Sequence, residues 1–305
     1  MSGRASLAFT AYLPLTASMS LVGLYVALSK PLVAVLPVFV LAFLRFGIAA
    51  VAMVPFTRRA PGEAPLSATE HRLLFVQSFF GNFLFSLCLL SGMAHTTATA
   101  AGVLLSTLPA AVALLSWLVL REKLSRRVVA AIVLAVGGVT LLQFAKADGA
   151  SVASSSWLGN LLILGAVFCE ATYVIIGKRL AATRTPLRVS ALINLWGLAL
   201  ITPFGLWQLQ RVDLGALSSA TWALLAFYSI AASLIAVWLW MTGLKHVPAN
   251  QAGVFTVALP ITAALVGVVA FGENFTGLHA AALLLAAGGV VLIATARPDA
   301  AVAPV

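Results

Sequence analysis

Charged residues are scarce in this sequence. Only 9% of the 305 residues are Asp, Glu, Lys or Arg, whereas 62% are hydrophobic, and an ordinary soluble domain carries about 25% charged residues. So few charges cannot cover a water-exposed surface, which excludes an ordinary soluble domain. The net charge of +10 does not indicate a nucleic-acid partner, because basic residues of membrane proteins collect in short loops beside the bilayer.

Cysteine, histidine and enzyme motifs are also rare. The two cysteines, Cys88 and Cys169, lie within apolar stretches and provide neither a disulfide framework nor a metal-ligand spacing. No pair of the four histidines has zinc spacing, and no Walker A sequence is present. We therefore expect no metal, no cofactor, no ATP-driven step and no enzyme activity.

Long apolar runs are what the sequence has instead. A helix needs about 20 apolar residues to cross the hydrocarbon core of a bilayer. Ten runs of this kind occur, at residues 9–29, 37–57, 72–94, 98–120, 126–144, 157–180, 186–208, 219–243, 249–271 and 277–295. All connections between them are short, so the sequence predicts an all-α, polytopic membrane protein of ten helices whose activity lies within or across the membrane.

The two halves of the chain are similar to each other. A gapless alignment of residues 92–142 with 243–293 leaves roughly nineteen of about fifty positions identical, which indicates an internal duplication. Upstream, "YVALSKPL" at residue 25 matches "YVIIGKRL" at residue 173. Each half therefore holds five spans, and we predict two repeats, residues 1–148 and 149–305, that form one transport unit.

The repeats are predicted to be inverted. Because five is an odd number, the second repeat must enter the membrane from the other side. The basic segment "LREKLSRR" at 120–127 corresponds to "FGENFTGL" at 271–278, which keeps the glutamate (Glu122 and Glu273) but no Lys or Arg. Placing both termini in the cytoplasm leaves only Lys30, Lys146 and Arg211 in outer loops, as the preference of Lys and Arg for the cytoplasmic side requires.

Inverted repeats are typical of secondary transporters, in which the substrate site lies near the midplane and access alternates between the two sides. Pro109 and Pro260 occupy matched positions near the middle of spans four and nine. A proline inside a helix removes a backbone hydrogen bond and bends or breaks the helix. We predict hinges or kinks at both, with a simple packing kink as the alternative.

Polar residues follow one face of span three and recur in span eight. A spacing of four residues places side chains on the same helix face. The candidates are Gln77, Ser78, Asn82 and Ser86 in span three, and Ser229 and Ser233 in span eight. Polar groups within the bilayer face the interior of a bundle, so these residues either line a cavity or hydrogen-bond between helices.

Glu170 is the only acid deep within a span. Its predicted role is to bind a substrate ammonium group or a coupling proton; a structural ion pair with Arg45, or a neutral acid, is the alternative. Tyr173 lies on nearly the same face, and Tyr25 and Trp238 complete the predicted cavity lining. Arg45, the one base well inside a span, is interpreted as structural.

Three segments resemble a known family. They are "LAFLRFGIAAVAMVPF" in span two, "LREKLSRR" followed by "AIVLAVGGVTLL", and "FGENFTG" followed by "ALLLAAGGVVLI". They are similar to the EamA-type branch of the drug/metabolite transporter superfamily, and the similarity covers nearly the whole chain. The resemblance implies ten helices in two inverted repeats, a cavity built chiefly from spans one, three, four, six, eight and nine, and metabolite export across a bacterial inner membrane.

Within that branch the chain most resembles the bacterial aromatic amino acid exporters. Such a substrate needs an apolar wall and a few polar groups for its ammonium and carboxylate. We therefore expect export of aromatic or other neutral amino acids, with another small metabolite or drug-like compound, or an intramembrane enzyme, as alternatives. The expected partners are the solute and the lipid bilayer, and a fused duplication needs no second copy, so a monomer would suffice.

Overall fold

The computed structural model describes residues 8–33, 35–59, 63–95, 104–105, 107–146, 157–271 and 277–294. Throughout these ranges the chain is helical apart from short turns, and they contain no strand. The predicted all-α fold is confirmed. The repeat boundary at 148/149, the first residues of span four and Glu273 lie outside the described residues.

In the first half of the chain, the described residues form helical runs that correspond to predicted spans one to five. They are η1 and α2 (Ala8–Tyr12, Leu13–Val33); α3 (Val38–Thr57); α4, η2 and α5 (Ala68–Ser78, Phe79–Leu84, Phe85–His95); α7 and η3 (Leu108–Leu115, Ser116–Leu120); and α8 (Arg126–Lys146). The segments η1, η2 and η3 are π-helical.

The second half repeats this order. Its runs are α9 (Trp157–Thr183); α10 (Pro186–Leu209); α11, η6 and α12 (Ser219–Ile230, Ala231–Ala236, Val237–Leu244); α13, η7 and α14 (Ala249–Val254, Phe255–Val257, Ala258–Phe271); and α15 (Gly277–Ala294), with a 3₁₀ turn, η5 (Leu214–Ala216), between the second and third. Within the described residues, five helices are long and apolar enough to cross a membrane.

Local signals set where these helices begin. Ser67 accepts a hydrogen bond from the Glu70 N–H, and Glu70 bonds back to the Ser67 N–H, forming a capping box at the start of α4. Ser218 caps α11 in the same way through the Thr221 N–H. Pro186 stands at the start of α10, where its missing N–H costs nothing.

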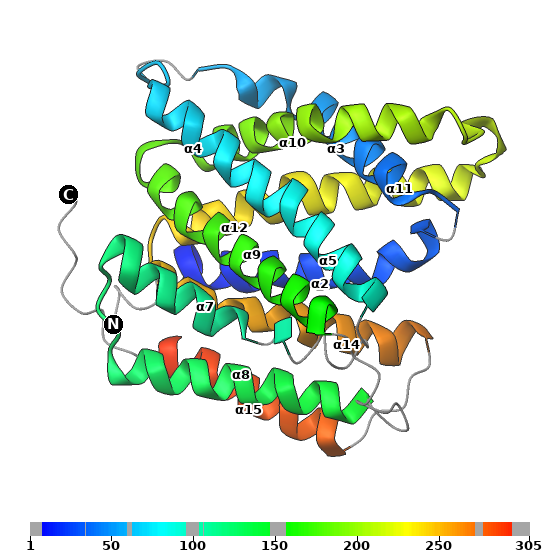
Figure 1. Ribbon diagram of the computed structural model, residues 1–305. Coiled ribbons are helices and arrows are strands. Elements are labelled where there is room, and N and C mark those ends of the chain that lie inside the picture. The colour runs from blue at the N-terminus through cyan, green and yellow to red at the C-terminus, as the bar shows by residue number, and fades with distance from the viewer. Residues whose placement is uncertain are drawn as a thin grey trace.

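Helices from the two halves pack against each other throughout (Figure 1). The closest pairings are α8 with α15, α3 with α10, α5 with α9, and α2 with α14. A Cβ added at Gly289 on α15 would lie 2.8 Å from the Ala131 carbonyl oxygen on α8, so the missing side chain is what allows these two backbones to approach.

The two ends of the bundle differ in chemistry. We call the end where α4 and α10 begin the basic end; it lies on the left of Figure 1. The opposite end contains a separate apolar cluster, which we call the opposite-end cluster: Leu32, Leu36, Val40, Leu41, Leu225 and Tyr228. The main core cluster joins α2, α9, α12 and α13 in the remainder of the bundle.

Candidate solute-binding site

Arg184 ties the two halves together at the basic end. Its Nε and Nη2 donate to Oε1 and Oε2 of Glu70 at 2.6 and 2.7 Å, and it also donates to the carbonyls of Ala64 and Pro65. Arg188 forms an ion pair of 2.7 Å with Glu63. Such a two-pronged contact between guanidinium and carboxylate fixes both partners in position. The loop before α4 is therefore held against the start of α10.

Glu122 makes a second connection at the same end. Its carboxylate accepts hydrogen bonds from the backbone N–H groups of Ala249 at 2.9 Å and Asn250 at 3.1 Å, and from the Ser116 hydroxyl. These N–H groups lie in the first turn of α13, where an anion is stabilised by unsatisfied donors. We call the contact of Glu122 with residues 249 and 250 the Glu122 latch.

Lys178 hydrogen-bonds to the segment just before α13, the helix whose first N–H groups bind Glu122. Its Nζ donates to the carbonyls of Leu244 at 2.8 Å and Val247 at 2.6 Å, which lie at the end of α12 and just before α13. A cation is favourable at carbonyls that the end of a helix leaves unsatisfied. Spans six, eight and nine are thus joined beside the latch.

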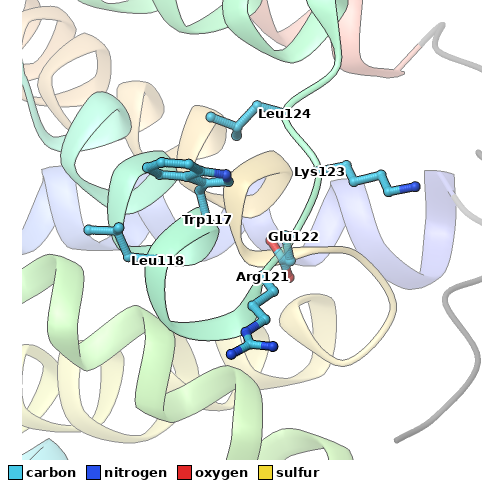
Figure 2. Close-up of a pocket in the computed structure, with 6 residues that line it drawn as sticks. All are labelled: Trp117, Leu118, Arg121, Glu122, Lys123 and Leu124. Atoms are coloured by element: carbon cyan, nitrogen blue, oxygen red, sulfur yellow. The ribbon is translucent and has the colours of Figure 1, made fainter.

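Figure 2 shows a pocket of about 540 Å³ beside the latch. Its lining is Trp117, Leu118, Arg121, Glu122, Lys123 and Leu124. The side chains of Arg121 and Lys123 point away from each other, so they do not converge on a common ligand (Figure 2). An exposed tryptophan beside exposed basic residues is typical of the membrane–water interface, and we interpret this pocket as the boundary of the bilayer.

Spans three and eight each contain a π-helical turn at matched positions. These are η2, which follows directly after the buried Ser78, and η6, which begins two residues after the buried Ser229. π-Helical turns are rare and occur frequently at functional sites. The predicted polar faces therefore surround two irregular turns, which the sequence did not reveal.

The polar face of span three contacts the second half of the chain. Gln77 Nε2 donates to the Tyr173 carbonyl at 3.1 Å, and the Ser78 hydroxyl donates to the Ile193 carbonyl at 3.0 Å. Asn82 Nδ2 in turn donates to Ser78 Oγ at 2.9 Å, while Gln77 Oε1 is buried with no partner among the described residues. These contacts bring Gln77, Ser78, Asn82 and Tyr173 together.

The matching face of span eight is packed more tightly. The Ser229 hydroxyl is buried and donates to the Leu225 carbonyl at 2.6 Å. Ser233 Oγ is buried with no partner in the described residues. Ser18 on α2, which sequence reasoning missed, donates to the Ala236 carbonyl at 2.7 Å, so the irregular turn η6 is bound to span one.

Glu170 lies midway along α9 and makes no ion pair in the described part of the chain. Val167 and Val174, about one turn away on either side, are each 1% exposed, so this face of α9 points into the bundle. Glu170 is nevertheless only half-buried. A carboxylate with accessible surface on an inward face is available to a polar or cationic solute.

Arg45 does not pair with Glu170. Its Nη1 donates to the Tyr25 hydroxyl at 3.0 Å, and its guanidinium carbon lies 4.2 Å from the centre of the Phe46 ring. The Tyr25 ring packs on Tyr228 with 4.5 Å between centroids. Tyr25 thus belongs to a second cluster, formed by spans one, two and eight.

The two prolines stand where helices restart. Helix α7 begins at Leu108 after Thr107, which places Pro109 in its first turn. Pro260 likewise stands in the first turn of α14, directly after the 3₁₀ turn η7. Pro109 thus stands in the first turn of a helix, where a proline costs no helical hydrogen bond, whereas Pro260 lies within the contiguous helical run 249–271. A hinge or kink at either proline stays a prediction.

Trp238, on α12, is 38% exposed. Its place in the cavity lining stays a prediction. Trp240, two residues further on, is 2% exposed, and its Nε1 is buried with no partner in the part of the chain that the structure describes.

The comparisons with known proteins agree with this architecture. The model of the EamA-like transporter family matches the chain twice, at residues 9–144 and 157–295. The chain belongs to the EamA-like transporter family. This EamA-like protein is 34% identical over 293 residues to the uncharacterized transporter YetK of Bacillus subtilis, covering 95% of this chain and 89% of the relative.

More distant relatives share the same architecture. An uncharacterized transporter of Archaeoglobus fulgidus is 25% identical over 84% of this chain and 85% of its own. A crystal structure with 19% identity superposes with a TM-score of 0.73 over 93% of this chain and 96% of that one, which shows the fold. This EamA-like protein is thus a polytopic membrane transporter with two repeats.

Proposed function

We propose that this EamA-like protein exports small neutral metabolites, most readily aromatic or other neutral amino acids, across the inner membrane by alternating access. Both termini and the basic end face the cytoplasm in this proposal, because Lys and Arg collect on that side. The residues proposed to line the solute path are Gln77, Ser78, Asn82, Glu170 and Tyr173 from one cluster, and Tyr25, Ser229 and Ser233 from spans one and eight.

The pair of matched π-helical turns in spans three and eight carries the proposal. Polar side chains of both spans lie at these turns inside the bundle, and irregular backbone at membrane depth is tolerated where it lines a cavity or is buried in protein. For one repeat to move against the other, the contacts that close the bundle at one end must also be able to break. The Glu122 latch and the Arg184 contacts join the repeats at the basic end through hydrogen bonds and ion pairs, which water can replace.

Each repeat supplies half of the path, so a monomer is the proposed functional unit. The test uses the purified full-length chain in liposomes with a panel of radiolabelled amino acids, with and without a proton gradient. Saturable movement of phenylalanine and tryptophan, competed by each other, is expected. If neither amino acid moves nor competes, the aromatic assignment is wrong.

A further inference from the structure

Arg45 is a cation that points into the bundle. One helical turn away on either side, Leu41 is 4% exposed and Ala49 is not exposed, so this face of α3 is turned away from lipid. The guanidinium lies at the junction of α2, α3 and α11, bonded to Tyr25 and packed over the Phe46 ring.

No counter-charge accompanies it. In the part of the chain that the structure describes, no carboxylate forms an ion pair with Arg45, and its Nε is buried with no partner. A hydroxyl and two aromatic faces compensate a partly buried guanidinium only in part, and an unpaired charge within a membrane protein is costly and commonly functional.

The fold itself does not require this charge. The sequence offset that matches Tyr25 with Tyr173 also matches Arg45 with Ile193, which is 3% exposed on α10. The second repeat therefore builds the corresponding buried position with a plain aliphatic side chain. A cation kept in one repeat alone indicates a role outside the common scaffold.

We propose that Arg45, together with the Tyr25 hydroxyl, binds the carboxylate of the transported solute. A guanidinium presents parallel N–H donors that match a carboxylate, and the paired rings of Tyr25 and Tyr228, with Phe46, supply an apolar wall for the rest of the solute. The inference rests on the proposed function for the idea that a small solute reaches this point. It assigns the substrate class: an apolar compound with one carboxylate.

The test compares three molecules that share one ring. Phenylalanine has both charged groups, 3-phenylpropionate has only the carboxylate, and phenethylamine has only the ammonium. Their competition against labelled phenylalanine is measured in proteoliposomes, and their effect on the unfolding midpoint is measured with the purified full-length protein. The variants are Arg45→Ile, which copies the second repeat, Arg45→Lys, and the control Arg211→Gln, whose side chain stacks on Trp207 outside the cluster.

The wild type is expected to prefer 3-phenylpropionate to phenethylamine at least tenfold. In Arg45→Ile the KM for phenylalanine should rise roughly 10- to 100-fold, the range expected for loss of a charge-assisted hydrogen bond, and the preference should disappear. Arg211→Gln should behave as the wild type. If Arg45→Ile does not fold, the second variant still tests the proposal. Arg45→Lys keeps the charge but loses the parallel N–H donors of the guanidinium, so it should raise the KM several-fold.

Unchanged KM and preference in a folded Arg45 variant would overturn the proposal and leave the proposed function intact. If the wild type moves no amino acid but is stabilised by 3-phenylpropionate, and Arg45→Ile is not, the amino acid assignment fails and the carboxylate site stands. A wild type that 3-phenylpropionate neither stabilises nor inhibits has no such site.

Discussion

Neutralising the Glu122 latch should open the basic end. In Glu122→Gln one carboxylate oxygen becomes an NH₂ group, which cannot accept from the N–H of Ala249 or Asn250 and would face a donor. A hydrogen bond to a charged group contributes about 1.5–3 kcal/mol. Losing one of the two should therefore shift the equilibrium toward the open state roughly 10- to 150-fold.

Cysteine labelling measures this shift directly. Ala252, which is not exposed, is replaced by cysteine in a background in which Cys88 and Cys169 are alanine. Because a buried thiol reacts only while the end is open, the rate of reaction with a charged maleimide should rise by the same factor in Glu122→Gln. Arg121→Gln, next to the latch in sequence but without a latch bond, should label at the background rate.

Two results would refute the reasoning. Unchanged labelling together with unchanged transport would show that the contact does not restrain the basic end. A lower unfolding midpoint with unchanged labelling would show that Glu122 stabilises both conformations equally and only caps α13.

Three further changes test other contacts. Arg184→Gln, which leaves Glu70 without its two-pronged partner, should lower the midpoint of thermal unfolding; an unchanged midpoint would contradict this. Gly289→Ala should cost about 1–3 kcal/mol because its methyl group would meet the backbone of α8, whereas Gly137→Ala, where nothing lies within 4 Å, should be neutral in the same measurement. Glu170→Gln should remove the effect of a proton gradient on phenylalanine transport if this acid carries a coupling proton; full transport with an unchanged response to the gradient would mean that Glu170 has no such role.

The helices could be predicted from the sequence because each apolar run is long and its ends are marked by Pro, Gly or charge. The sequence also indicated an irregularity at Pro109. It suggested a bend within one helix, whereas in the structure helix α7 begins at Leu108, just before this proline. Hydropathy reports how long a run is, but the position of a proline within a turn depends on where the helix actually begins.

Side-chain direction in span eight could not be predicted. A π-helical turn adds a residue to the helical repeat, so η6 rotates α12 relative to α11 compared with a continuous α-helix. The directions of the Trp238 and Trp240 side chains therefore cannot be derived from regular helical spacing, and no residue type in the sequence indicates the π-helical turn. The partner of Arg45 was hidden for a related reason, because Tyr25 and Arg45 meet only through the packing of α2 against α3.

The contrast between the two ends of the bundle implies that physical conditions act on them separately. The Glu122 and Arg184 contacts at the basic end are electrostatic, and dissolved salt screens the attraction between partly exposed charges. The opposite-end cluster is held by hydrocarbon contact, which charge screening does not weaken. Raising the ionic strength should therefore favour opening at the basic end over opening at the opposite end.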